Sequence, residues 1–303
     1  MKKHPLAAYL ILVTALSGGL ILLMKILGQK GFYIGQFYMF TPAMAAVIAR
    51  IFFYEGGFSD ARLNIGRLRH YLRFYGLTLA IVAGCYLAYW IFGAVSWDFT
   101  GDTFLNTLGT QMEATGKDIN DLPLGLTPKM MLLLFAIGGL TVFNIPFTIS
   151  GFGEEFGWRG FMLPLVYGLT KPYKAFLVCG LIWFAWHTPL VLVIPKTHHM
   201  TAAENTLNAV VLATGSVATF VFLAYVFAES GSIWVASFVH AVLNNASRSL
   251  AYFAVVDNQV LANVALTTVM VVVVLALYVS GGLRVFRVFF SSEAARPRPT
   301  GGP

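Results

Sequence analysis

Residues 153–160 read Gly-Glu-Glu-Phe-Gly-Trp-Arg-Gly, and the three charged side chains of this stretch follow closely on an apolar run at 129–150. Two further polar clusters interrupt apolar runs, and they are Trp183-x-x-x-His187 and His240-x-x-x-Asn244. Ionisable groups are costly inside a bilayer, so they rarely persist at membrane depth without a use. The pattern therefore predicts a membrane protein whose buried polar groups serve one function.

The composition indicates the class of protein. The chain of 303 residues is 58% hydrophobic and 11% charged, with a mean hydropathy of +0.74, whereas a soluble globular chain is typically about a quarter charged. Apolar windows of roughly 20 residues, long enough to span a bilayer, fall near 7–27, 33–54, 72–95, 129–150, 175–195, 207–228, 232–250 and 260–282. We therefore predict an all-α, polytopic membrane protein of about eight transmembrane helices.

Other compositional features exclude alternatives. The first apolar run, Leu6 to about Leu27, is long enough to span the membrane rather than to be removed as a signal peptide. Cys85 and Cys179 lie inside apolar segments, which predicts neither a disulfide framework nor a cysteine metal site. The net charge of +7 would suggest nucleic acid in a soluble protein. Here its distribution indicates topology, and no nucleic-acid partner is expected.

The charge distribution orients the predicted spans. The connection 50–73 carries five arginines against two acids, and the tail from 284 onward carries four arginines against one acid. The positive-inside rule places both segments in the cytoplasm, which predicts two cytoplasmic termini. Lys2 and Lys3 agree with this orientation, whereas Lys25 and Lys30 would lie on the outer side. The acidic connection 96–128 is predicted to be an exterior loop with a short surface helix.

One integral membrane domain is expected over residues 1–290, with the motifs in 129–250. Residues 291–303 are rich in Pro, Arg and Gly, which predicts a disordered cytoplasmic tail. We find no inverted-topology repeat of the kind that favours a transporter.

The Glu-Glu-x-x-x-Arg string predicts a division of labour between two neighbouring acids. On a helix, Glu155 and Arg159 are four residues apart and therefore adjacent. Glu154 points about 100° away and is free for another task. Its own neighbour four residues on is Trp158, whose apolar ring would favour the protonated carboxyl. Ser150, Gly151 and Gly153 indicate a helix start just upstream, which would favour the ionised form; the sequence leaves the balance open.

The histidine segments also show a four-residue spacing. Trp183 and His187 share a helix face, and Pro189 removes a backbone donor and clashes with a preceding carbonyl, which predicts a kink near His187. His240 and Asn244 share a face of another span, where both can donate hydrogen bonds to a developing oxyanion. Asn245 points in an adjacent direction and is expected to serve in packing.

A carboxylate, two imidazoles and an amide are a complete set of groups for activating a water and stabilising an oxyanion. Together they predict an intramembrane hydrolase. Taken singly, each cluster has a plain structural interpretation, as a helix cap, a surface ion pair or an interhelical hydrogen bond. A proton- or cation-coupled transporter, or a non-catalytic membrane scaffold, would also use buried Glu and His.

The three motifs in this order resemble those of the CPBP family (CAAX protease and bacteriocin-processing, also called Abi) of intramembrane proteases. The family pattern is Glu-Glu-x-x-x-Arg, then Phe-x-x-x-His, then His-x-x-x-Asn or a similar small residue. The chain departs from it at Trp183, which keeps an aromatic ring where Phe is usual. The resemblance covers roughly residues 129–250, and the first three spans match only in general character.

The resemblance implies an active-site cavity within the membrane that opens toward the cytoplasm. It implies that Glu154 and His187 activate a water that attacks a peptide carbonyl. His240 and Asn244 would stabilise the oxyanion, and Glu155 and Arg159 would hold the glutamate helix in place. The implied enzyme is a CAAX-type endopeptidase, either glutamate-dependent or metal-dependent.

No cofactor is expected to be required, because the His-Glu-x-x-His helix of zinc peptidases is absent. If zinc is present, Glu154, His187 and His240 are the expected ligands. The expected substrate is a peptide or a prenylated membrane protein, and membrane lipid is the other expected partner. The compact chain favours a prokaryotic inner membrane.

Counting residues leaves a mismatch in depth. At about 1.5 Å per residue, His187 lies about 20 Å and His240 about 14 Å into the bilayer. Glu154 falls at the cytoplasmic end of its apolar window. These groups can meet only if 151–168 re-enters the membrane or the fifth span begins later, and Pro146 with the nearby glycines favours a kinked segment.

Overall fold

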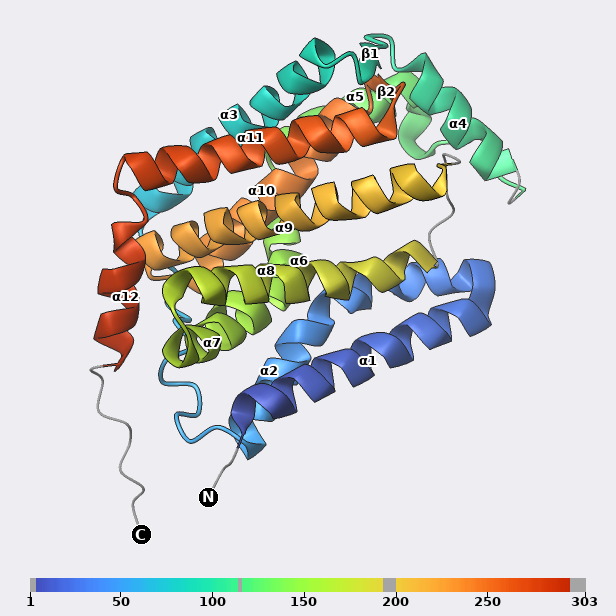
Figure 1. Cartoon of the computed structure of the whole chain (residues 1–303). Coiled ribbons are helices and arrows are strands. Elements are labelled where there is room, and N and C mark those ends of the chain that lie inside the picture. The colour runs from blue at the N-terminus through green and yellow to red at the C-terminus, as the bar shows by residue number, and fades with distance from the viewer. Residues whose placement is uncertain (1–3, 114–115, 193–199, 295–303) are drawn as a thin grey trace.

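The structure is a computed structural model that describes residues 4–113, 116–192 and 200–294. Helices dominate it, as Figure 1 shows. The α-helices are α1 (Pro5–Leu27), α2 (Thr41–Phe52), α3 (Leu68–Ile91), α4 (Asp102–Glu113), α5 (Pro128–Leu140), α6 (Asn144–Gly157), α7 (Leu163–Leu169), α8 (Pro172–His187), α9 (Ala202–Ser230), α10 (Ile233–Ala251), α11 (Gln259–Val279) and α12 (Arg284–Ala294). A π-helical turn (Trp158–Met162) joins α6 to α7, and 3-10 segments occupy Gly28–Phe40, Pro123–Gly125 and Thr188–Leu192.

The described part of the chain confirms an α-helical, polytopic membrane protein. Five helical runs are long and apolar enough to cross a bilayer: α1, α3, α9, α11 and the run Ile34–Phe52, which joins part of a 3-10 segment to α2. A sixth span results if α5 and the bent run Asn144–Leu169 are one crossing. The expected number was about eight. Helix α8 is shorter than a full crossing, with 16 residues, and α10 carries His240, Asn244, Asn245 and Arg248, which lower its hydropathy.

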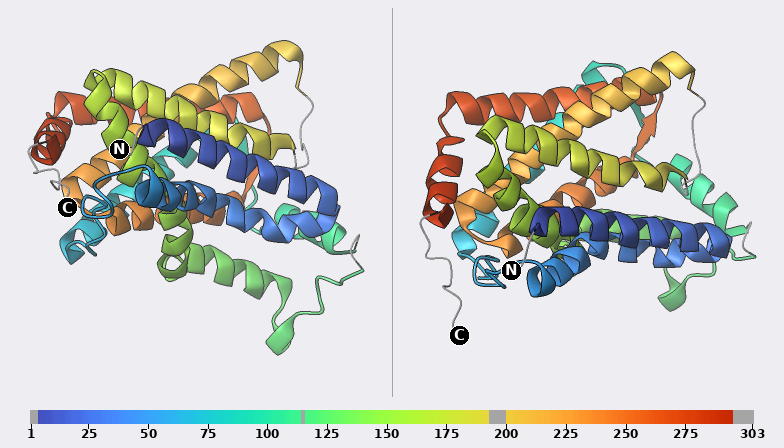
Figure 2. Two further views of the ribbon diagram at one scale, coloured as in Figure 1. Left: turned by 90° about the horizontal axis from the view of Figure 1, so that it is seen from below. Right: turned by 60° about the horizontal axis from the view of Figure 1, so that its bottom comes forward.

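The three helices that carry the sequence motifs, α6, α8 and α10, belong to one bundle. In Figure 1, the long helices α1, α8, α9 and α11 run side by side, with α6 and α10 behind them, and Figure 2 gives the same bundle from two other directions. The start of α1 and helix α12 lie toward one end of the bundle, and α4 lies toward the other (Figure 1). Both ends of the described chain thus lie toward the same end of the bundle.

The sequence did not predict a small β-sheet. Strands β1 (Val95–Trp97) and β2 (Ala254–Val256) pair antiparallel, with Val95 opposite Val256. They tie the end of α3 to the end of α10. The expected surface helix in the acidic connection is α4. Before it, Asp98 accepts hydrogen bonds from the Thr100 hydroxyl and the Thr103 amide, which hold the pKa of this carboxyl well below its usual range.

Helix α6 packs closely against α10 and against the segment that leads into α2. The interpretation of Gly151 as part of a helix start is wrong, because α6 begins at Asn144. A Cβ on Gly151 would collide with the backbone carbonyl of Ser237 in α10, and one on Gly157 would lie 2.6 Å from the carbonyl oxygen of Pro42. These glycines therefore allow close helix approach, as small residues do in membrane bundles.

A bend between α5 and α6 sets the depth of the glutamates. The axis turns by 58° between Pro128–Leu140 and Asn144–Leu169. The Tyr75 hydroxyl donates to the Leu140 carbonyl at 2.5 Å, and the Asn144 side chain donates to the Thr141 carbonyl at 3.0 Å. Because the helical run starts at Asn144, Glu154 lies inside it and not at its end. The mismatch in depth arose from placing the span limit at 150.

The π-helical turn is held by a buried arginine. Arg50 of α2 donates to the carbonyl of Gly160 at 2.7 Å and to the carboxylate of Asp60 at 2.5 Å. Its guanidinium is fully buried among aromatic rings, including Phe156 at 5.7 Å and Phe161 at 5.0 Å. A π turn shifts the hydrogen-bond pattern of a helix and often marks a functional site. Arg50 stabilises this turn directly after Glu154 and Glu155.

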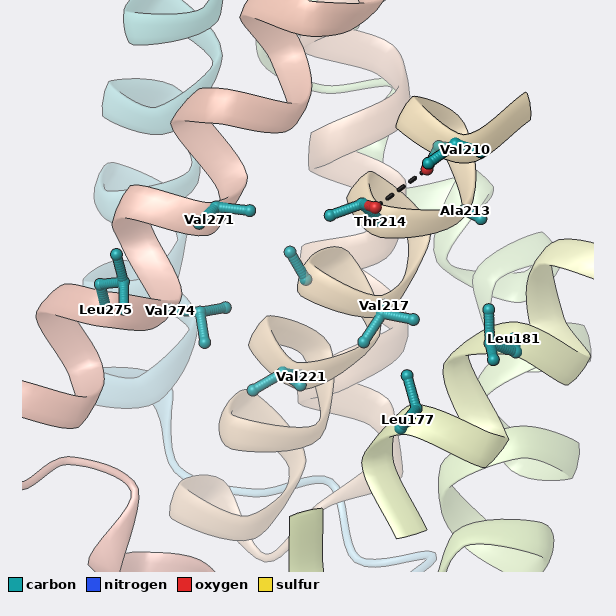
Figure 3. A pocket seen from close by; sticks show the side chains of 11 residues that line it. Leu177, Leu181, Val210, Ala213, Thr214, Val217, Val221, Val271, Val274 and Leu275 are labelled. Atoms are coloured by element: carbon teal, nitrogen blue, oxygen red, sulfur yellow. Dashed lines mark hydrogen bonds between the residues drawn. The ribbon is translucent and has the colours of Figure 1, made fainter. Parts of the chain in front are cut away.

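An apolar groove of about 410 Å³ lies between α8, α9 and α11 (Figure 3). Its lining includes Leu181, Val217 and Val274, and the hydroxyl of Thr214 is already bonded to the Val210 carbonyl at 2.9 Å. Leu181 and Trp183 are two residues apart, which places them about 200° apart on α8. The groove therefore lies on the side of α8 that faces away from Trp183.

Substituting Arg50 tests its role in the fold. We expect Arg50→Ala to lower the free energy of unfolding by about 3 kcal/mol or more, because it leaves buried partners uncompensated. Thermal unfolding in detergent measures the change. The matched control is Lys129→Ala, which removes an ion pair to Asp102 whose side chains are both more than half exposed and should cost about 1 kcal/mol or less. Equal effects of the two variants would contradict the assignment.

Candidate active site

Glu154 occupies the centre of the buried polar cluster. Its side chain is fully buried, and its Oε2 accepts a hydrogen bond from Nε1 of Trp183 at 2.7 Å. Its Oε1 has no hydrogen-bond partner among the described residues and lies 3.9 Å from Nε2 of His240. One oxygen of the carboxylate is thus fixed by a hydrogen bond, and the other accepts none from the described residues.

Glu155 faces different partners, as the rotation of about 100° between neighbouring helical residues predicts. Its Oε1 accepts from Nη1 of Arg159 at 2.8 Å and from Nδ1 of His240 at 2.8 Å. All three side chains are buried. The expected pairing of Glu155 with Arg159 is confirmed. The bond to His240 was not predicted, because it joins two helices.

Arg159 lies in an aromatic environment. Its guanidinium lies 4.1 Å from the ring centroid of Phe220 and 5.0 Å from that of Trp183. Cation–π contacts of this kind strengthen when they are removed from water. They help to compensate a charge that has only one carboxylate within hydrogen-bond distance, and they fix the π turn against α8 and α9.

His187 ends helix α8, which continues as the 3-10 turn Thr188–Leu192. The change of helix type one residue before Pro189 confirms the predicted break. Nδ1 of His187 bonds the backbone carbonyl of Trp183 at 2.9 Å. A carbonyl can only accept, so Nδ1 carries a proton, and in the neutral form of the ring Nε2 would present a lone pair. The half-buried ring packs edge-on against Trp183 and Trp186.

The two asparagines of α10 have different surroundings. Asn245 is buried and donates to the side chain of Asn144 at 3.0 Å. Asn244 is half-buried, and its side chain makes no hydrogen bond to another described residue. The expected packing role of Asn245 agrees with its bond. Neither Asn244 nor His187 is hydrogen-bonded to Glu154 within the described part of the chain; Trp183 is the residue that contacts both Glu154 and His187.

Sequence reasoning missed the contribution of the N-terminal helices. Nε1 of Trp186 donates to the hydroxyl of Ser17 at 2.8 Å, and the hydroxyl of Tyr38 donates to the backbone carbonyl of Trp186 at 2.6 Å. Thr41 bonds Ser17 at 2.7 Å. These residues brace the end of α8 beside His187. Ser17, Tyr38 and Thr41 lie in apolar windows with no spacing motif, so nothing in the sequence marked them.

The environment of Glu154 also differs from the one expected. The predicted neighbour, Trp158, packs edge-on against Tyr9 and Trp186, with ring centroids 5.8 Å and 5.6 Å away. The polar partner of Glu154 is Trp183, 29 residues along the chain. Because α6 begins at Asn144, the predicted influence of a helix N-terminus on Glu154 is absent.

A zinc ion was the alternative cofactor. Within residues 4–113, 116–192 and 200–294, no group of three His, Cys, Asp or Glu side chains is arranged to hold a metal ion. Glu154, His187 and His240 therefore do not form a ready ligand set in this conformation. His240 is engaged through Nδ1 with Glu155, and His187 is oriented by a backbone carbonyl.

The fold and the site define a polytopic helical membrane protein with a buried cluster of Glu, His and Arg side chains. Residues 131–246 match the family described as type II CAAX prenyl endopeptidase Rce1-like. The match contains all six predicted site residues. Over these residues the chain is similar to the Rce1-like CAAX peptidases, which agrees with the family inferred from the motifs. A comparison with curated proteins finds no match.

Substituting Glu155 tests whether this residue stabilises the fold around the site. Glu155→Ala removes the acceptor for both Arg159 and His240, so we expect a loss of about 3–5 kcal/mol in unfolding free energy. Thermal unfolding in detergent is the measurement, and activity should fall with it. Glu229→Ala, which removes the partly exposed pair with Arg73, should cost about 1 kcal/mol or less. A Glu155→Ala protein as stable as the Glu229→Ala protein would refute the supporting role.

Proposed function

We propose that the chain is an intramembrane endopeptidase that hydrolyses a peptide bond with a water activated by Glu154 and His187. The observation that carries this proposal is the asymmetric environment of Glu154. One carboxylate oxygen is held by Trp183, and the other is buried, unpartnered among the described residues and 3.9 Å from His240. A base in a buried site with one free oxygen has the form that proton transfer requires.

The reaction follows from these groups. Oε1 of Glu154 takes a proton from a water, whose second hydrogen bonds Nε2 of His187. The oxygen attacks the peptide carbonyl carbon, and the carbonyl oxygen becomes the oxyanion of a tetrahedral intermediate. Glu154 then returns the proton to the leaving nitrogen as the C–N bond breaks. Positioned acid–base groups of this kind contribute about 10²–10⁴-fold to a rate.

His240 and Asn244 are proposed to donate hydrogen bonds to the oxyanion. In this role His240 donates from both ring nitrogens and is therefore protonated, and its ring lies against the carboxyl groups of both Glu154 and Glu155. Nδ1–H of His240 donates to Glu155, and Nε2–H then faces the reacting side. Asn244 lies one helical turn further along the same face of α10, and its amide is free of other described partners.

No metal is included in this mechanism. Nδ1 of each imidazole bonds an oxygen, that of Glu155 or that of the Trp183 backbone, and such bonds orient the ring whether or not Nε2 binds a metal. The proposed substrate is a peptide or a prenylated membrane protein, since the matching family is described as a prenyl endopeptidase family.

The proposed topology has eight crossings, a cavity open to the cytoplasm and both termini in the cytoplasm of a prokaryotic inner membrane. The arginines of the connection 50–73 support this orientation. The start of α1 and helix α12 lie toward one end of the bundle (Figure 1), which supports a common side for the termini.

Cleavage of a quenched fluorescent peptide library by detergent-purified protein tests the reaction. We expect Glu154→Ala, His187→Ala and His240→Ala each to abolish cleavage while the proteins remain folded, and we expect a metal chelator to leave the wild type unaffected. Loss of cleavage with chelator would place a metal in the site. Normal turnover by any of the three variants would contradict the mechanism, and ion flux without peptide products would favour a transporter.

The asparagine pair provides a matched test of the oxyanion site. Asn244→Ala should lower kcat by about 10²–10³-fold, the effect of removing one oxyanion donor, with little change in the unfolding temperature. Asn245→Ala should instead lower the stability, because it leaves the side-chain oxygen of the buried Asn144 without its donor. Steady-state kinetics and thermal unfolding of both variants show which asparagine acts in the reaction and which supports the fold. The assignment is wrong if Asn244→Ala cleaves as fast as the wild type.

A further inference from the structure

We propose that Trp183 is a positioning residue whose indole N–H determines which oxygen of Glu154 reacts. This inference rests on the proposed function. It concerns a side chain whose indole N–H has no counterpart in the phenylalanine usual at this position of the family pattern. The hydrogen bond is therefore a property of this chain.

The indole of Trp183 fixes the orientation of the Glu154 carboxylate. The Nε1–H of Trp183 meets Oε2 of Glu154 at 2.7 Å, a distance typical of a charge-assisted hydrogen bond. This bond fixes the rotation of the carboxylate about its last side-chain torsion, which is otherwise broad. Oε1 is consequently directed toward the side where Nε2 of His240 lies, 3.9 Å away.

Trp183 also contacts His187. The backbone carbonyl of Trp183 accepts from Nδ1 of His187 at 2.9 Å, and the two rings pack edge to face with centroids 4.9 Å apart. The carbonyl bond sets the tautomer of the imidazole. Trp183 thus touches both groups proposed to activate the water, through its side chain on one and its backbone on the other.

The side chain of Trp183 is itself held in a fixed position. The side chain is buried, with the Arg159 guanidinium 5.0 Å from its ring centroid. The ring of Phe220 lies 6.2 Å away on one helix and that of His240 6.2 Å away on another. A side chain enclosed from three helices holds its rotamer, so the N–H direction is preset before substrate binds. Preset geometry of this kind lowers the barrier of a reaction.

A direct test uses the indole N–H signal and does not depend on activity. The protein is labelled with ¹⁵N-tryptophan, and the Trp183 indole resonance is assigned by its absence in Trp183→Phe. We expect the Trp183 indole proton to resonate downfield in the wild type and to move upfield in Glu154→Ala, while the other indole signals stay in place. An unmoved Trp183 signal would overturn the inference. If Trp183→Phe folds poorly, the Trp183 signal is assigned by elimination from single Phe variants of the other five tryptophans.

Kinetics provide the second test. Trp183→Phe keeps an aromatic ring but removes the donor, and we expect kcat to fall about 10- to 100-fold, the effect of a hydrogen bond to a charged group, with KM unchanged. A purely structural role would lower the unfolding temperature and the active fraction without this selective change in turnover per folded molecule. Trp234→Phe is the matched control. Trp234 stacks on Phe152 at 4.5 Å, and its N–H bonds no described residue.

The outcomes separate this inference from the proposed function. If Glu154→Ala is inactive but Trp183→Phe turns over like Trp234→Phe, the positioning role is wrong and the glutamate mechanism stands. If Glu154→Ala cleaves like the wild type, the proposed function fails together with the positioning role, even where the indole signal confirms the hydrogen bond. A selective fall in kcat in Trp183→Phe, together with the upfield shift of the Trp183 signal in Glu154→Ala, supports both the positioning role and the proposed function.

Discussion

Two adjacent carboxylates, those of Glu154 and Glu155, are fully removed from solvent, and the arrangement of the surrounding helices depends on compensating them. An unpaired buried ion costs several kcal/mol even after relaxation. The compensating groups come from three elements: Arg159 from the π turn, Trp183 from α8 and His240 from α10. Each interaction that lowers the cost of burial therefore also fixes a helix against α6, so stability and site geometry have the same origin.

The two acids are chemically identical, and their surroundings make them different. Oε1 of Glu155 accepts two bonds, from Arg159 and His240, so that carboxylate is committed to structure. Glu154 accepts its one bond at Oε2, from the uncharged indole of Trp183. Each carboxylate keeps one oxygen without a partner among the described residues, Oε1 of Glu154 and Oε2 of Glu155, so the two acids differ in the groups that hold the other oxygen. Neighbouring residues on a helix face different directions, which is why one sequence pair can supply both a support and a reactive group. The arrangement also leaves His240 shared between them.

Interactions within one helical turn could be predicted from the sequence, and interactions between helices could not. The spacing of Glu155 and Arg159 and the proline after His187 each specify a local structure, and both expectations are confirmed. The bond from Trp183 to Glu154 depends on how α8 is rotated relative to α6, which no local pattern encodes. The expectation of a helix start at Gly151 is wrong, because a glycine that precedes a helix and a glycine that admits a neighbouring backbone look alike in a sequence.

The bend before α6 explains how charged groups reach the level of the histidines. A helix that started near residue 151 would leave Glu154 in its first turn, at the edge of the bundle. Starting at Asn144 after a 58° turn places Glu154 well inside the run. Irregular backbone at membrane depth is tolerated only where protein satisfies its polar groups. Tyr75 and Asn144 bond the carbonyls of Leu140 and Thr141, and Asn245 bonds Asn144 in turn. The asparagine beside Asn244 thus supports the bend that positions the glutamate, which links the third motif to the first through packing as well as through the proposed chemistry.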